Sequence, residues 1–401
     1  MKIRHFWVWL HRWAGLGMAG FLMLLGLTGS ILAFWNELNH WLTPNLYPGL
    51  HAGVELDAAS LARRAESLAP QARATQVYLG YIGTAFVAME AREGSPELGF
   101  DQIYLDNVSG AELGRLQFGE LPTTLNAVMP FIYELHYNLA LGRFGKWILG
   151  TVALIWTLDC FVAFYLTIPT PTHSSSKSFF FRWKSAWLVK WGAAYRVNFD
   201  LHRAGGLWLW AMLIVFAWSS VYFNMKGVYT QATQFFVDYE PQDTVQSAHL
   251  SNHNHPQMEW EDVQNIAKSL MDVQAREHDF KIDRVIALYH LRERGIYHYR
   301  VHSSRDVGEK YGMTSISIDA YSGRLLATHL PTGQHSGNTF TTWLVELHMA
   351  NVFGRPYQIL VCCSGFVVAM LSVTGVYIWW RKRAARLAHV RRPAARPGPA
   401  E

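Results

Sequence analysis

The sequence predicts an α-helical membrane protein, with four transmembrane helices in a duplicated 2+2 arrangement and two small α+β modules outside the membrane. Two observations support this fold class. Four apolar runs are long enough to cross a bilayer, which takes about 20 residues in a helix, and short motifs recur once in each half of the chain. The composition agrees, because 14% of the residues are aromatic and 17 are Trp, as expected where spans are bordered by interfacial aromatic belts.

The apolar runs cover about 13–35, 147–168, 204–223 and 357–380, and only the second contains a charged residue, Asp159. The first run is too long for a signal peptide and shows no small-residue cleavage site, so we expect a retained signal anchor. The predicted order is an inner N-terminus with the first span, an outer module, a span, a basic loop, a span, a second outer module, a span and a basic tail. The corresponding ranges are 1–35, 36–146, 147–168, 169–203, 204–223, 224–356, 357–380 and 381–401.

Basic residues predict the orientation of these spans. They concentrate before the first span, between the second and third, and after the fourth, and short loops rich in Lys and Arg stay in the cytoplasm. We therefore expect both termini in the cytoplasm and the two modules outside, in a periplasm or its equivalent, with lipid as the main surrounding partner. The net charge of +5 comes largely from these anchors, so no nucleic-acid partner is expected.

The two long segments repeat one pattern. In the first, Asp57 is a plausible N-cap for a helix, and extended runs follow near 75–80, 84–90 and 101–106. In the second, a helix is expected to begin at Trp260. Each segment also contains a strand followed by an Asp-x-x-Ser-Gly turn, at 106–110 and at 319–323. The spacing of these turns indicates a tandem duplication of span, module and span.

Four histidines recur in the same duplicated context. His11 and His202 each stand in a Leu-His-Arg motif before an apolar run, and His136 and His348 each end a Glu-Leu-His motif. Imidazole is a common axial ligand of haem iron, and facing helices can hold one haem between two histidines. The sequence therefore predicts haem ligation at these positions. The alternative is that each is an ordinary polar residue at the membrane boundary.

The predicted positions of the four histidines favour two haems. His11 and His202 lie near the inner face and His136 and His348 near the outer face, and a span of about 35 Å is too long for one haem to use both levels. The expected pairs are thus His11 with His202 and His136 with His348, although a four-span bundle admits other pairings. No Cys-x-x-Cys-His motif is present, so the haems are expected to be of b type.

Arginines accompany each histidine. Arg12 and Arg203 follow directly, and Arg143 and Arg355 follow seven residues later. Arg binds carboxylates in a bidentate manner, so these residues are candidates for the haem propionates; the alternative is that they anchor the chain to lipid phosphates. Asp159 is a second candidate for function, because charges at membrane depth are costly and often functional.

Other polar residues are weaker candidates. His249, His253 and His255 have a spacing that could bind a transition metal, but a polar loop is the preferred interpretation. His335 could face the outer haem or its substrate, and His5 and His40 are reserve ligands. The three cysteines, Cys160, Cys362 and Cys363, all lie in predicted spans. No disulfide is expected.

Together these motifs resemble a known family over about 1–383. The modules with Asp-x-x-Ser-Gly turns are similar to PepSY domains, and the Leu-His-Arg and Glu-Leu-His spans are similar to the PepSY-associated transmembrane family. That resemblance implies an inner-membrane haem protein that reduces a ferric siderophore in the periplasm. The chain has no nucleotide-binding motif, so a quinol or a separate reductase would donate the electrons. The alternative is a non-redox PepSY membrane protein that binds or regulates an envelope peptidase or another partner.

Overall fold

A computed structural model describes residues 2–49, 52–170, 178–241, 245–248 and 257–390. The chain divides into two compact units. The helical unit consists of Met1–Ile31, Leu141–Met225 and Ile359–Glu401. The sheet unit consists of Leu32–Ala140 and Lys226–Gln358. Each is described by itself below.

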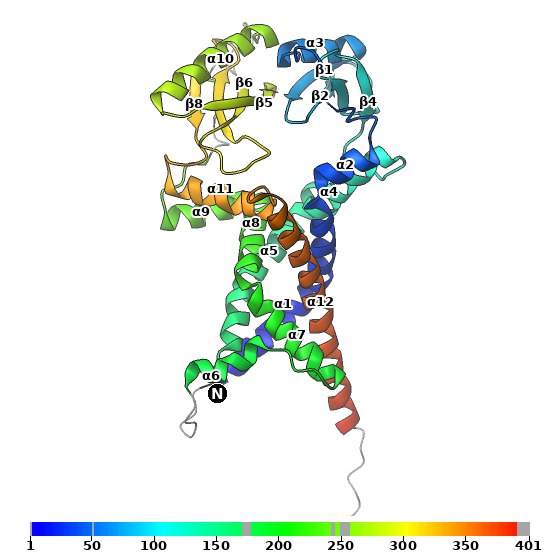
Figure 1. Ribbon diagram of the computed structural model, residues 1–401, viewed down its shortest axis with the longest axis vertical. Helices are drawn as coiled ribbons and strands as arrows, with labels where there is room; N and C mark the ends of the chain where they lie inside the picture. The colour runs from blue at the N-terminus through cyan, green and yellow to red at the C-terminus, as the bar shows by residue number, and fades with distance from the viewer. Residues whose placement is uncertain (1, 50–51, 171–177, 242–244, 249–256, 391–401) are drawn as a thin grey trace, which may run out of the picture. The chain divides into compact units, whose positions relative to one another are not determined.

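The helical unit contains the candidate membrane spans (Figure 1). Its helices are α1 (Lys2–Leu32), α5 (Gly142–Thr167), α6 (Phe179–Trp183), α7 (Ala194–Trp208), α8 (Trp210–Asn224) and α12 (Gly354–Val390). Three of them, α1, α5 and α12, are long and apolar enough to cross a membrane. Large apolar side chains such as Leu158, Phe161 and Phe366 are more than half exposed on these helices, as expected for surfaces that contact lipid. The chain is therefore a helical membrane protein.

The third predicted span, 204–223, differs from the structure. Instead of one helix, α7 and α8 meet at Leu209 with a bend of 69°. The first half of α7 carries charged residues such as Arg196 and Asp200, which disfavour a straight continuation into lipid. Gly205 and Gly206 precede the bend by one turn, and glycine weakens a helix locally. The unit thus has three continuous spans and one broken candidate.

Two glycines bring α1 and α12 into close contact. A Cβ on Gly26 would lie 2.5 Å from the carbonyl oxygen of Gly365, so no side chain fits at this crossing. The hydroxyl of Ser30 donates a hydrogen bond of 2.8 Å to the carbonyl of Cys362 on the facing helix. Small residues at a crossing are typical of helices that pack within membranes.

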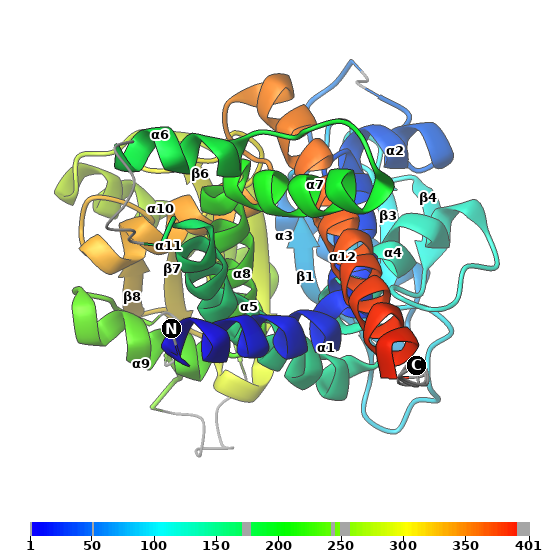
Figure 2. The same ribbon diagram turned by 90° about the horizontal axis from the view of Figure 1, so that it is seen from below.

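Basic residues gather at one end of the helical unit. The N-terminus, α6, α7 and the end of α12 lie at the lower end of this unit in Figure 1, the end that faces the viewer in Figure 2. That end carries Arg4 of α1 and the Arg381–Arg383 stretch of α12, together with Arg196. The distribution agrees with the predicted basic anchors.

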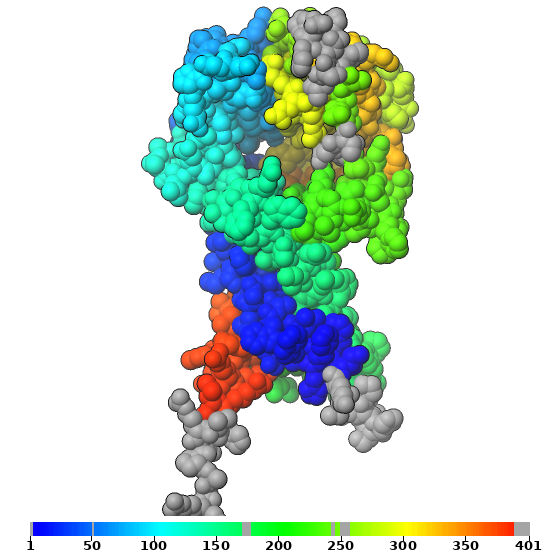
Figure 3. Space-filling model, turned by 180° about the vertical axis from the view of Figure 1, so that it is seen from behind, coloured from blue at the N-terminus to red at the C-terminus, as the bar shows by residue number. Residues whose placement is uncertain are grey.

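The sheet unit contains eight strands in one antiparallel sheet, with the order β4-β3-β2-β1-β5-β6-β7-β8. The strands are β1 (Ala72–Tyr78), β2 (Thr84–Ala91), β3 (Gln102–Asp106), β4 (Glu112–Leu116), β5 (Ile282–Leu291), β6 (Ile296–Ser303), β7 (Thr314–Asp319) and β8 (Leu325–His329). The helices are α2 (Trp35–Leu42), α3 (Ala58–Leu68), α4 (Val128–Asn138), α9 (Lys226–Phe236), α10 (Trp260–Glu277) and α11 (Ser336–His348). In Figure 3 the two halves of this unit lie side by side.

The sequence predicted two small α+β modules, and the structure joins them into a single sheet. Each half contributes four strands and one covering helix, as expected from the duplication. The joint is the antiparallel pairing of β1 with β5, in which Gln76, Val77 and Tyr78 face Tyr289, Leu288 and Ala287. Pairing two edge strands removes exposed backbone donors and acceptors from both modules, which favours the fused sheet over separate ones.

Local signals in the two modules are confirmed. The Asp57 carboxylate accepts the Ser60 backbone N–H at 2.8 Å and begins α3. In the two Ser-Gly turns, Asp106 and Asp319 accept bonds from the backbone N–H and hydroxyl groups that follow them. Helices α3 and α10 cover one face of the sheet, where Leu61 and Val263 are fully buried among strand side chains.

Candidate functional site

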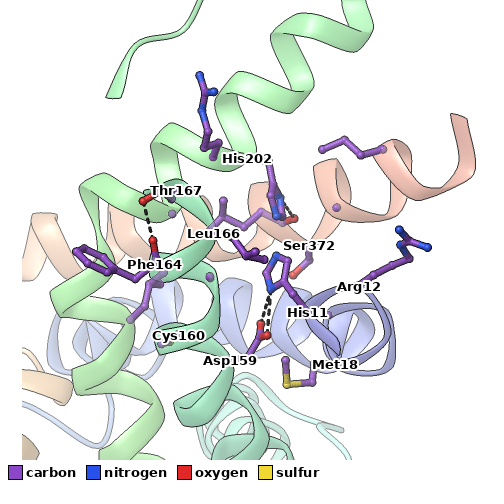
Figure 4. Close-up of a pocket in the computed structure, with 18 of the residues that line it drawn as sticks. His11, Arg12, Met18, Asp159, Cys160, Phe164, Leu166, Thr167, His202 and Ser372 are labelled. Carbon is purple, nitrogen blue, oxygen red and sulfur yellow. Dashed lines mark hydrogen bonds and ion pairs between the residues drawn. The ribbon is translucent and has the colours of Figure 1, made fainter. Parts of the chain in front are cut away.

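His11 and His202 lie opposite one another in the helical unit. His11 extends from α1 and His202 from α7, and their ring centres are 6.1 Å apart with an interplanar angle of 56°. Figure 4 shows both rings pointing into the same pocket. The structure thus brings together the first pair that the sequence predicted.

The Nδ1 atom of each ring is held by a partner on a facing span. His11 Nδ1 lies 2.9 Å and 3.0 Å from the two carboxylate oxygens of Asp159 on α5. His202 Nδ1 lies 3.0 Å from the carbonyl oxygen of Leu371 and 3.1 Å from the hydroxyl of Thr374 on α12. The carbonyl oxygen of Leu371 only accepts hydrogen bonds, so Nδ1 of His202 carries the proton. The lone pair is then on Nε2, the state of a metal-ligating histidine with a second hydrogen-bond partner.

The separation of the rings fits two ligands on one metal ion. Metal–imidazole bonds are about 2.0 Å long and a ring centre lies about 1.1 Å behind its nitrogen, so two imidazoles on opposite sides of one iron have centres roughly 6.2 Å apart. The observed 6.1 Å matches this distance. No cluster of three or more His, Cys, Asp or Glu suited to a metal occurs in the described part of the chain. Two facing histidines at this distance fit the pair of ligands that a protein can supply to haem.

The pocket between the rings has room for a flat cofactor. Its volume is about 480 Å³, within the roughly 300–1,000 Å³ of sites that hold small molecules. Gly15, Gly206 and Gly375 line it, and a Cβ on Gly375 would lie 3.2 Å from Cε1 of His202. Side chains at these positions would fill space beside the rings. The walls are otherwise largely apolar and aromatic, including Trp156 and Trp210.

Four cationic side chains also line this pocket: Arg4, Arg12, Arg203 and Lys382. Arg203 is already paired with the buried carboxylate of Asp200 at 2.8 Å, and Arg4 donates to the carbonyls of Leu166 and Ile168. Arg12 forms no hydrogen bond or ion pair with any residue that the structure describes. Of the two arginines predicted here, Arg12 is therefore the better placed for a propionate.

His136 and His348 form a second pair, in the sheet unit. Their ring centres are 6.3 Å apart with an interplanar angle of 74°, which again fits two imidazoles on one iron. His136 lies in the last turn of α4, and His348 is the last residue of α11. Burial and the neighbouring His136 lower the pKa of His348 to about 3, so this ring is neutral and able to bind a metal near pH 7.

The chain leaves both histidine helices in a similar way. Leu139 and Ala140 follow α4 and Ala350 and Phe353 follow α11, and all four have positive φ. Non-glycine residues rarely adopt this conformation, and among the other described non-glycine residues only Asp279 has it. The duplicated motif is therefore followed by a similar turn in both halves of the chain.

The two arginines predicted for the second haem differ in their surroundings. Arg355 is paired with Glu37, with Nη1 3.2 Å from the carboxylate oxygen. Arg143 is exposed near the start of α5, in the helical unit. Their proposed contacts with propionates remain predictions.

The weaker candidates lie elsewhere. His335 contacts Asp238 and Glu240 at 2.7 Å and 3.0 Å, and His40 stacks against Tyr47. His5 lies in α1, six residues before His11. His249, His253 and His255 fall outside the described residues. All three cysteines are free, as expected.

Two features of the first site were not predicted. The sequence left the partner of Asp159 open, because nothing local links it to His11, 148 residues away. Lys382 was interpreted only as a membrane anchor, yet it lines the pocket. Only the positions of these two residues in the sequence hinted at a role in the site. Asp159 is the only charged residue in a predicted span, and Lys382 is among the first basic residues after the fourth predicted span.

Comparison with known proteins gives one result at the level of the family. No curated protein matches the chain. The family model of the PepSY-associated TM region matches residues 8–382, a range that contains both histidine pairs and most of each candidate span. The chain therefore belongs to the PepSY-associated TM region family.

Proposed function

We propose that this protein is a bacterial inner-membrane oxidoreductase with two b-type haems, one between His11 and His202 and one between His136 and His348. It passes electrons from the cytoplasmic side to a ferric siderophore in the periplasm and reduces Fe(III) to Fe(II). The observation that supports this most is the geometry of the two pairs, with ring centres 6.1 Å and 6.3 Å apart. The basic end of the helical unit supports a cytoplasmic location for both termini.

Different residues of the chain would have different roles in such an electron carrier. The four imidazoles would supply axial ligands, and Asp159, Leu371 and Thr374 orient the first two rings. Arg12 is available for a propionate, and the apolar pocket excludes water. When bound, haem supplies a centre that accepts and donates one electron at a time.

Reduction would release the iron because siderophore oxygens are hard donors that prefer Fe(III) to Fe(II). Each ferric ion takes one electron, so one quinol, giving up two electrons and two protons, could serve two ferric ions. A separate reductase is the other possible donor. The siderophore itself is suggested by family resemblance, whereas the electron-carrying role is suggested by the histidine pairs.

An absorption spectrum of the purified protein tests the proposal. We expect a Soret band, sharp bands on reduction with dithionite, and about two haems per chain that acid and organic solvent extract. Anaerobic mixing of the reduced protein with a ferric hydroxamate or catecholate should reoxidise it and produce Fe(II), detected by a ferrous chelator. A colourless protein would refute the haem assignment and favour a role in binding an envelope partner. A coloured protein that no ferric chelate reoxidises would refute only the assignment of a ferric siderophore as the substrate.

A further inference from the structure

The two histidines of the first pair have different hydrogen-bond partners, although they occupy matching positions of the repeat. His11 is held by the Asp159 carboxylate on α5. His202 is held by the carbonyl of Leu371 on α12. Leu371 is the residue of the second repeat that corresponds to Asp159, 212 positions later. The duplicated geometry is thus kept, while a neutral backbone oxygen stands where the first repeat has an acid.

The Asp159 carboxylate is well placed to act on this ring. Asp159 is 8% exposed, and both of its carboxylate oxygens lie within 3.0 Å of His11 Nδ1. It is the only carboxylate that lines the pocket among the described residues. A charge in such surroundings acts strongly, because the effective dielectric constant is far below that of water.

A carboxylate behind a ligating imidazole has a known physical effect. It fixes the ring and its tautomer, and it makes the far nitrogen a more basic donor. A more basic donor, with a nearby negative charge, stabilises Fe(III) relative to Fe(II) and so lowers the reduction potential. Second-shell hydrogen bonding is one of the means by which proteins set haem potentials.

We propose that Asp159 is a positioning residue that acts through His11 and lowers the reduction potential of the haem held by His11 and His202. This inference rests on the proposed function. Its consequence is a bias in direction: a lower potential at this haem makes it give up its electron more readily to the next acceptor.

The test compares D159N, D159E and T374V in otherwise unchanged, full-length protein. Asn keeps the shape and a hydrogen-bond acceptor but removes the charge, and Glu keeps the charge. T374V is the matched control, because it removes a neutral partner of His202 while the Leu371 carbonyl remains. The midpoint potentials of both haems are measured by redox titration followed in the visible spectrum. The same substitutions in an H136A background identify the potential of the His11–His202 haem.

D159N should raise one of the two midpoint potentials and leave the other unchanged. D159E should restore most of the difference, and T374V should shift it much less than D159N. The titration follows only molecules that hold haem, so partial loss of haem does not obscure the result. Unchanged potentials in D159N would overturn the inference. Complete loss of this haem in D159N would also overturn it if T374V and D159E both kept the haem at an unaltered potential. Absence of haem from the wild type would instead refute the proposed function.

Discussion

Removal of single histidines tests whether the chain holds two separate haems. The two pairs belong to different units of the structure, and each has ring centres about as far apart as two ligands of one iron require. Wild-type protein should therefore contain two six-coordinate, low-spin haems. H348A leaves His136 facing a methyl group that cannot reach the iron, so that haem is either lost or becomes high-spin.

The double variants give the number of low-spin haems expected per chain. H348A should reduce the number of low-spin haems per chain from about two to about one, and H136A/H348A should still have about one, because both substitutions affect the same haem. H11A/H348A should have none, because it damages both. Substitutions at independent sites add, whereas those at one shared site do not.

Quantitative electron paramagnetic resonance of the oxidised protein counts low-spin haem directly, and a pyridine haemochrome assay gives the total. H335A is the matched control, since His335 belongs to the same unit as His348 but contacts Asp238 and Glu240. It should keep both low-spin haems. If H11A/H348A retained one low-spin haem, or if H136A/H348A had none, the pairing derived from the ring distances would be wrong.

Three further predictions concern the surroundings of the sites. G375V should displace His202, because a Cβ at this position already lies 3.2 Å from the ring, and the spectrum should lose the low-spin signal of that haem. G17V, at an open position of α1, should leave that signal unchanged. G26L should lower the thermal stability of the detergent-solubilised protein more than G20L, because only Gly26 packs against the Gly365 carbonyl; equal melting temperatures would contradict this. D319A should destabilise the sheet unit by about 1–3 kcal/mol, because Asp319 is buried and accepts bonds from Tyr321, Ser322 and Ser247. Burial raises the pKa of Asp319, but these hydrogen bonds outweigh burial and lower the pKa overall. The contribution of Asp319 to stability is therefore present above the usual pKa of aspartate and is lost as the pH falls through the lowered pKa. Denaturation curves of wild type and D319A should converge at low pH.

Features set by a few neighbouring residues were predictable from the sequence. The cap at Asp57, the helix that begins at Trp260 and both Ser-Gly turns depend on residues within one turn of each other. The pairing of His11 with His202 was also predictable, because the repeat placed both near the same ends of apolar runs. Features that join distant segments were not. The β1–β5 joint involves three residue pairs over 200 positions apart, and alternation along a strand does not say which edge it will meet.

The bend between α7 and α8 shows how hydropathy alone can mislead. The run 204–223 is apolar throughout, yet the helix that carries His202 begins ten residues earlier, at Ala194, and includes Asp200 and Arg203. Those residues form a buried ion pair that a hydropathy profile counts only as polar. The bend at Leu209 separates this helix from the apolar half, and His202 lies in the polar half.

The duplication explains the positions of the four histidines but not the different surroundings of His11 and His202. Each pair takes one histidine from each repeat, so two identical repeats would surround both rings of a pair in the same way. The structure breaks this equivalence where it bears on a ligand: Asp159 faces His11, and the backbone of Leu371 faces His202. A single acid in one repeat changes the charge near one pair without disturbing the scaffold that holds it. A duplicated fold can in this way provide two matched histidine pairs, while a difference at one position gives the two rings of one pair different hydrogen-bond partners.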